Sequence, residues 1–173
     1  TKGGHLVLDN DELLAALDGE MIFYETPDGR ACVALPWLNK PLIGSTDIRV
    51  DDPDDVRCEE DEVDYIFDAI RVAFPDIRFD RSQILSSFSG VRPLRSSSAS
   101  RTGQMSRAHY CAVLEPEPED SFPVYCMIGG KWTPFRVFAE HVADMLLARL
   151  GRPRKAGTVD MPIGGGKAYP AAD

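Results

Sequence analysis

The chain has 173 residues, of which 43% are hydrophobic and 27% charged, and its formal net charge at pH 7 is -9. This size and apolar content suffice for one buried core, so a single domain is expected. The acidic balance argues against nucleic acid as a partner and against electrostatic docking on anionic lipid. The four cysteines lie far apart with no histidine at metal-ligand spacing, which predicts no metal site and no disulfide framework, and favours a reducing cytoplasm.

The start of the chain reads like an internal segment. The chain begins at Thr1 without an initiator methionine and passes, after Lys2 and two glycines, into the strand-like run 5–8. No apolar run approaches the roughly 20 residues of a membrane span. We therefore expect the chain to be a piece cut from a longer protein, with no membrane-inserted segment of its own.

Short apolar runs separated by turn residues predict the strands of a sheet. After the first strand at 5–8, the runs 21–24 and 31–35 flank an Asp-Gly pair, which is a strong hairpin signal. Residues 41–47 predict the next strand, and the acidic stretch 51–55 predicts an exposed loop.

Helical spacing of apolar residues predicts two helices. One covers 58–74 and ends at Pro75, and the other covers 135–150. Strands are predicted over 84–93, 110–114 and 124–128. The fold class is therefore α+β, with an antiparallel or mixed sheet and helices packed on one face. Residues 1–150 are interpreted as one domain and 151–173 as a flexible tail.

Positive charge is concentrated in one stretch of this acidic chain. No acidic residue occurs between Asp80 and Glu115, whereas five arginines fall there: Arg81, Arg92, Arg95, Arg101 and Arg107. Guanidinium groups bind phosphate or carboxylate through bidentate, charge-assisted hydrogen bonds. The stretch therefore predicts a site for a small anion, and the alternative is a set of solvated surface arginines.

Two further features have both a functional and a structural interpretation. Residues 129–133, Gly-Gly-Lys-Trp-Thr, join a strand to a helix start, where free amides favour an anion or an electron-rich ring. The alternative there is an ordinary tight turn. His5 begins an apolar strand and can take up a proton near neutral pH, although a lone histidine is more often structural.

Taken in order, five segments resemble the FAD-dependent glycerol-3-phosphate dehydrogenases of the D-amino-acid-oxidase-like flavoproteins. They are KGGHLV at 2–7, IGSTD at 43–47, FSGVRPL at 88–94, Ser-Arg at 106–107 and GGKWTPFR at 129–136. The resemblance extends over roughly the first 150 residues. It implies that the chain is the substrate-binding cap domain of such an enzyme.

The resemblance also implies a division of roles. Arg92 and Arg107 would hold the phosphate of glycerol 3-phosphate, with Lys131 near both the substrate and the flavin. His5 would accept the proton of the C2 hydroxyl, so that His5 and Lys131 are the catalytic candidates. The expected contacts to FAD come from Thr46, Gly129, Gly130, Lys131 and Thr133.

At the level of the whole protein, the family passes the C2 hydride to FAD, forms dihydroxyacetone phosphate and delivers electrons to membrane quinone. The resemblance thus implies a cytoplasmic protein at the inner face of the cytoplasmic membrane, and a homodimer is the assembly we consider. The sequence leaves the oligomeric state, the membrane association and the choice between quinone and oxygen open.

Two departures from the family pattern matter. Pro134 stands where the family usually has a second threonine, and no GxGxxG segment is present to bind the FAD pyrophosphate. We therefore expect the chain by itself to bind no FAD tightly and to be inactive. Two alternatives stay open: an amino-acid-oxidising flavoprotein, and a stand-alone module that binds a phosphorylated metabolite through Arg92, Arg95 and Arg107.

Overall fold

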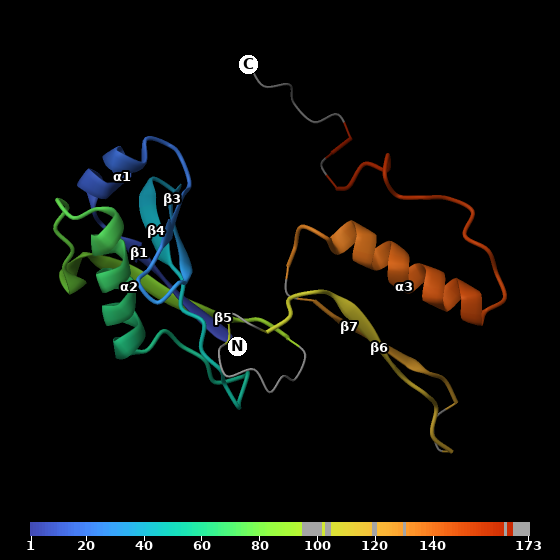
Figure 1. The fold of residues 1–173 in the computed structure, drawn as a ribbon. Coiled ribbons are helices and arrows are strands. Elements are labelled where there is room, and N and C mark those ends of the chain that lie inside the picture. The colour runs from blue at the N-terminus through green and yellow to red at the C-terminus, as the bar shows by residue number, and fades with distance from the viewer. Residues whose placement is uncertain (95–101, 103–104, 119–120, 130, 165, 168–173) are drawn as a thin grey trace. The chain divides into compact units, whose positions relative to one another are not determined.

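A computed structural model describes residues 1–94, 102, 105–118, 121–129, 131–164 and 166–167 (Figure 1). The chain divides into two compact units, Thr1–Met105 and Ser106–Asp173, and each is described by itself. The interpretation of residues 1–150 as one domain with a flexible tail stays a prediction. In the ranges just given, every helix is too short or too polar to cross a membrane.

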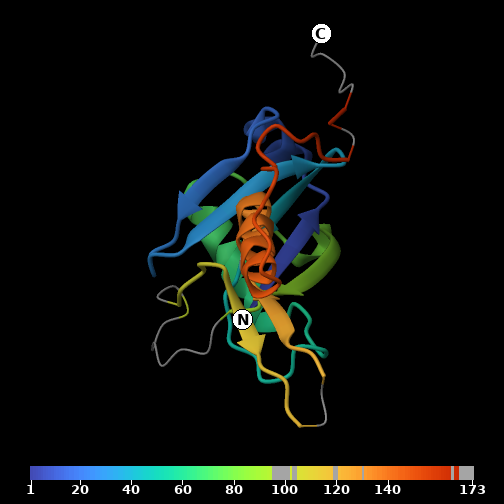
Figure 2. The same cartoon turned by 90° about the vertical axis from the view of Figure 1, so that its right-hand side faces the viewer.

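The first unit is built on a five-stranded antiparallel sheet with the strand order β2-β3-β4-β1-β5. Its strands lie side by side in the rotated view (Figure 2). The tight link between β3 and β4 has positive φ at Leu38 and Asn39, 49° and 61°, as a type I′ turn requires. The bounds are Lys2–Leu8 for β1, Ile22–Glu25 for β2, Ala31–Trp37 for β3, Lys40–Gly44 for β4 and Ile84–Val91 for β5.

Two helices, α1 (Asp11–Leu17) and α2 (Glu60–Ala73), pack on one face of this sheet, and a short 3-10 helix, Arg81–Gln83, leads into β5. The register places Leu6, Ile43 and Ala34 in one row across β1, β4 and β3, all on the helix side. The α+β class and the antiparallel sheet are confirmed. The buried core is formed by side chains of the sheet and of the helices that pack on it: Leu6, Leu8, Leu13, Leu17, Ala34, Ile43, Val63, Ile66, Phe67, Ile70 and Phe79.

No helix formed by the described residues of the first unit packs on the opposite face of the sheet. Side chains alternate along a strand, so the register of β1 with β5 and β4 places His5, Phe88 and Gly44 together on that face. At its edge, on β2, Phe23 is 71% exposed. This open face is where two of the predicted site residues, His5 and Arg92, come together.

In the part of it that the structure describes, the second unit contains a hairpin and one helix. Strands β6 (Tyr110–Leu114) and β7 (Val124–Ile128) pair antiparallel over the predicted residues, and α3 spans Phe135–Arg149. Pro134 is the N-cap of α3 and forms no side-chain capping bond. After the helix, the Thr158 hydroxyl donates to Glu140 over 2.7 Å, which ties part of the following segment to α3.

Candidate functional site

His5 lies on the open face, on the strand β1 between β4 and β5. Its ring stacks on Phe88 with centroids 5.2 Å apart, and on the other side a Cβ at Gly44 would lie only 2.6 Å from its Cδ2. The Nδ1 atom is buried and has no hydrogen-bond partner among the described residues. Burial, and then the charge of Arg92, lower the pKa of His5, while the Gly3 backbone acts in the opposite direction. The imidazole is therefore neutral near pH 7 and suited to accept a proton.

Arg92 follows β5 directly and projects from the same face as His5. Its backbone N–H donates to the Thr1 carbonyl over 2.7 Å, which extends the β1–β5 pairing. Its Nη2 donates to Ser45 Oγ over 3.3 Å, and its Nη1 lies 3.5 Å from Asp47 Oδ1. Two segments that are remote in sequence thus bring a guanidinium group beside a neutral histidine.

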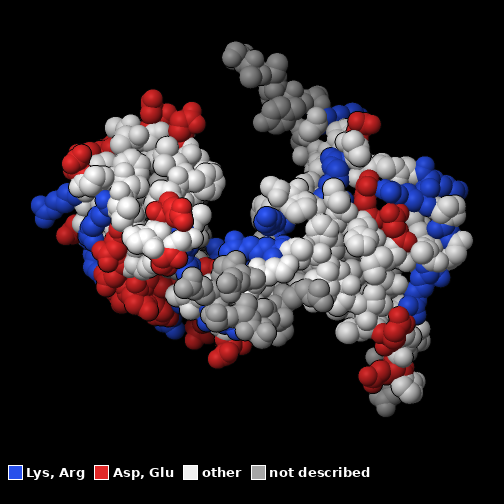
Figure 3. All heavy atoms as spheres, in the orientation of Figure 1, with Lys and Arg blue, Asp and Glu red and all other residues white. Residues whose placement is uncertain are grey.

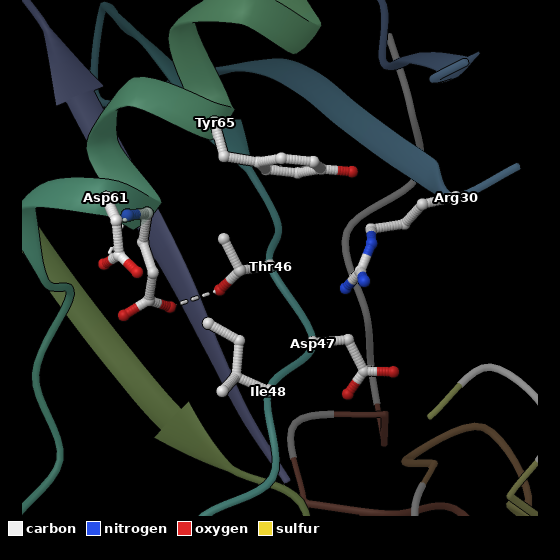
Figure 4. Close-up of a pocket in the computed structure, with 7 residues that line it drawn as sticks. Arg30, Thr46, Asp47, Ile48, Asp61 and Tyr65 are labelled. Atoms are coloured by element: carbon white, nitrogen blue, oxygen red, sulfur yellow. Dashed lines mark hydrogen bonds between the residues drawn. The ribbon is translucent and has the colours of Figure 1, made fainter. Parts of the chain in front are cut away.

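Thr46 is turned to the other side of the sheet, toward α2. It is 3% exposed, accepts a hydrogen bond from the Gly4 amide over 2.7 Å and donates to Glu62 Oε1 over 2.5 Å (dashed line in Figure 4). Glu62 also forms an ion pair of 2.6 Å with Lys2. The Thr46 hydroxyl therefore links β1 to α2, and the flavin contact inferred for it from the resemblance stays a prediction.

A pocket of about 240 Å³ opens beside Thr46 (Figure 4). On its far side the Arg30 guanidinium lies 5.5 Å from the centre of the Tyr65 ring. Three carboxylates line the same pocket, those of Asp47, Asp61 and Glu62, so its charge does not favour a phosphate.

Acidic side chains also gather over α2 and the loop that precedes it (Figure 3). Within the stretch of arginines, Arg81 binds Glu60 and Asp64 of α2 on this surface. Arg81 therefore contributes to the surface of the first unit and not to the open face. Arg95 and Arg101 lie outside the described residues.

The remaining predicted site residues belong to the second unit. Lys131 and Thr133 are exposed at the turn before α3, and Arg107 is exposed ahead of β6. Gly130 lies outside the described residues. A pocket of about 390 Å³ at this turn is lined by Met127, Gly129, Lys131, Trp132, Phe135 and Phe138. It is mainly apolar, with one ammonium group at its edge.

The structure thus brings His5 and Arg92 together in the first unit and places Gly129 and Lys131 around one pocket in the second. That these two sets of residues belong to one site stays a prediction. Sequence reasoning gave no role to five residues that lie against His5 or Arg92: Gly3, Gly44, Ser45, Asp47 and Phe88. All five occur in the segments that carry the resemblance, but their contacts depend on a strand register that one sequence does not reveal.

Comparisons with known proteins place these features in a family. A family described as FAD dependent oxidoreductase matches residues 1–145. The chain is 32% identical to a glycerol-3-phosphate dehydrogenase of Synechocystis sp., over 98% of this chain and 30% of that protein. It is 31% identical to an aerobic glycerol-3-phosphate dehydrogenase of Bacillus subtilis, over 96% of this chain and 29% of that protein.

Among solved structures, the chain resembles the glycerol-3-phosphate dehydrogenase of Bacillus halodurans complexed with FAD. The TM-score is 0.72 at 27% identity, over 97% of this chain and 30% of that one. The chain therefore spans less than a third of the length of these relatives. The match over residues 1–145 nevertheless shows that the chain belongs to the FAD dependent oxidoreductase family.

Proposed function

We propose that this chain is the substrate-binding part of a glycerol-3-phosphate dehydrogenase that oxidises sn-glycerol 3-phosphate to dihydroxyacetone phosphate with FAD as hydride acceptor. One observation carries the proposal. On the open face of the sheet, the neutral imidazole of His5 on β1 and the guanidinium of Arg92 at the end of β5 come from neighbouring strands, and the carboxylate of Asp47 lies 3.5 Å from the guanidinium. An anion-binding group next to a base suits a phosphorylated alcohol.

Arg92 would bind the substrate phosphate through two parallel N–H donors, and Arg107 would add a second positive charge. With the phosphate held in this way, the C2 hydroxyl is directed to His5, which accepts its proton. Lys131 is the proposed partner for negative charge that develops during the reaction. The role of Arg107 and Lys131 beside the residues of the first unit is part of the proposal.

The residues present fit FAD. The Nδ1 of His5, a residue of the open face, is buried and has no partner in the described part of the chain. The pocket at Gly129 and Lys131 combines apolar walls with a cation, as the edge of a flavin ring requires. FAD, when bound, supplies the hydride acceptor. Gly129, Gly130, Lys131, Thr133 and Thr46 are the residues proposed to hold it.

The electron acceptor, the cellular location and the assembly of the full-length protein are also proposed, and these three points rest on the resemblance alone. Membrane quinone is the proposed acceptor, at the cytoplasmic side of the membrane, and a homodimer is the proposed assembly. The 173-residue chain by itself is expected to contain no flavin and to be inactive, since it has no GxGxxG segment. The flavin content of the purified chain tests that point.

The reaction is tested on the full-length, flavin-loaded protein. Under anaerobic conditions, sn-glycerol 3-phosphate is expected to bleach the flavin absorbance, and inorganic phosphate is expected to compete. D-Amino acids serve as the comparison, because arginine also binds carboxylate. Bleaching by an amino acid but not by glycerol 3-phosphate would overturn the assignment, and so would binding of glycerol 3-phosphate without any bleaching.

A further inference from the structure

Two adjacent glycines of β1 face opposite sides of the sheet, and each leaves room for a different side chain. At Gly4, a Cβ would lie 2.8 Å from the sulfur of Cys58 and 3.2 Å from Glu62 Oε1, on the helix side. At Gly3, a Cβ would lie 2.5 Å from Nη2 and 2.9 Å from Cζ of Arg92, on the open face. Real Cβ atoms essentially never approach another heavy atom within 3.0 Å.

We propose that Gly3 is a positioning residue for substrate binding: its missing side chain lets the Arg92 guanidinium lie against the β1 backbone beside His5. The inference rests on the proposed function of Arg92 as the phosphate ligand. It assigns to the first glycine of the Gly-Gly pair a role in recognition, whereas the second glycine serves the packing of α2.

The surroundings of Arg92 leave its guanidinium little freedom in this position. Ser45 Oγ accepts from Nη2 over 3.3 Å, and the carboxylate of Asp47, 7% exposed, lies 3.5 Å from Nη1. The Arg92 backbone is fixed by its bond to the Thr1 carbonyl. A methyl group at position 3 would therefore displace the guanidinium from these partners. The clash meets the far end of a flexible side chain, so the sheet itself can survive the change.

Gly90 provides a matched control. It stands directly opposite Gly3 in the β1–β5 register, on the same face of the sheet, and a Cβ at Gly90 would meet no atom of the described residues within 4 Å. Gly90→Ala and Gly3→Ala thus make the same chemical change at paired positions. Only the change at Gly3 reaches Arg92.

The experiment uses the full-length, flavin-loaded enzyme and its variants Gly3→Ala, Gly90→Ala, Arg92→Ala and the double variant Gly3→Ala/Arg92→Ala. KM for sn-glycerol 3-phosphate, kcat, Tm and flavin content are measured. Gly3→Ala is expected to raise KM by about tenfold or more, the loss expected for a weakened hydrogen bond to a charged group. Its kcat is expected to change much less, and Gly90→Ala is expected to behave like the wild type.

The double variant separates positioning from a general structural effect. If Gly3 acts through Arg92, adding Gly3→Ala to Arg92→Ala changes KM no further, because the two effects are not additive. If Gly3→Ala alone fails to fold, the double variant should recover a folded, flavin-loaded protein, since the clashing group is gone.

Three results would overturn the inference: a wild-type KM in Gly3→Ala, additive losses in the double variant, or a double variant that fails to fold like the single one. An unchanged KM in Arg92→Ala would instead remove the proposed function of Arg92 and this inference with it. A raised KM in Arg92→Ala beside a wild-type KM in Gly3→Ala overturns the inference alone.

Discussion

His5 and Phe88 stack across the β1–β5 pair, with their ring planes inclined by only 11°. Phe88 is 44% exposed, so its contact serves the orientation of the imidazole more than the stability of the sheet. In the full-length enzyme we expect Phe88→Leu to lower kcat by about two- to tenfold, the range given by the energy of an aromatic pair. KM and Tm are expected to stay near the wild-type values in steady-state and thermal-unfolding measurements.

Ser86→Ala is the control for this change. Ser86 lies two residues away on the same face of β5, opposite Val7, and removal of its hydroxyl leaves the stacked pair intact. A wild-type kcat in Phe88→Leu would show that the stack does not orient His5.

The low pKa of His5 gives a pH dependence with a defined sign. Burial and the charge of Arg92 place this pKa below its ordinary value of 6.5. Because the neutral imidazole is the proposed base, kcat/KM is expected to fall as the pH drops through the lowered pKa. Arg92→Gln removes the positive charge, so the pKa rises and the acid limb of the profile moves to higher pH. The measurement is kcat/KM against pH for both proteins.

Arg81→Gln controls for the loss of a positive charge as such. Arg81 is engaged with Glu60 and Asp64 on the surface of α2 and does not contribute to the lowered pKa of His5. The acid limb of the kcat/KM profile of Arg81→Gln is expected to coincide with that of the wild type. An acid limb that stays in place in Arg92→Gln would contradict the electrostatic coupling between Arg92 and His5.

Local patterns in the sequence predicted most elements of the fold. The strands of the second hairpin lie at the predicted residues, because each is a short apolar run with clear boundaries. The helix predicted over 58–74 is α2, Glu60–Ala73. The helix α1 was missed because its seven residues span only two turns and its buried residues, Leu13 and Leu17, form a single pair at helical spacing. Its available signal was Asn10, whose side chain caps the helix by accepting from the Leu13 amide over 2.8 Å.

The candidate site was predictable only in part. Arg92 and His5 stand out by residue type, but their neighbours Gly3 and Phe88 do so only once β1 is paired with β5. These strands are separated by about 80 residues of chain, and no local turn fixes their register. Thr46 shows the same limit, since its hydroxyl turns toward Glu62 on the helix side of the sheet.

The buried ion pair of Lys2 and Glu62 is expected to be essential for the stability of the first unit. Glu62 is 1% exposed, and it receives hydrogen bonds from Thr46 and from the Glu59 amide besides the Lys2 contact. Glu62→Gln leaves the Lys2 ammonium buried without its counter-charge. The free energy of unfolding is expected to fall by about 3 to 5 kcal/mol, as measured by denaturant unfolding of the purified chain.

Glu60→Gln is the matched control on the same helix. Glu60 binds Arg81, but its side chain is 86% exposed, so solvent screens the pair and its loss is expected to change stability little. Equal destabilisation by Glu62→Gln and Glu60→Gln would mean that burial does not decide the strength of these two ion pairs.

A substitution of Lys131 tests the proposed role of the second unit in the reaction. Its ammonium group lines the pocket between β7 and α3, and a positive charge there is expected to act where negative charge develops in the reaction. We expect Lys131→Met to lower kcat by about 100-fold, the usual cost of removing one preorganised stabilising group. Lys131→Arg, which keeps the charge, should recover part of the activity. Lys155→Met, in the segment after α3, changes the net charge equally but lies in a different pocket, so a similar loss of kcat in that variant would show that the effect is not specific to the turn at Lys131.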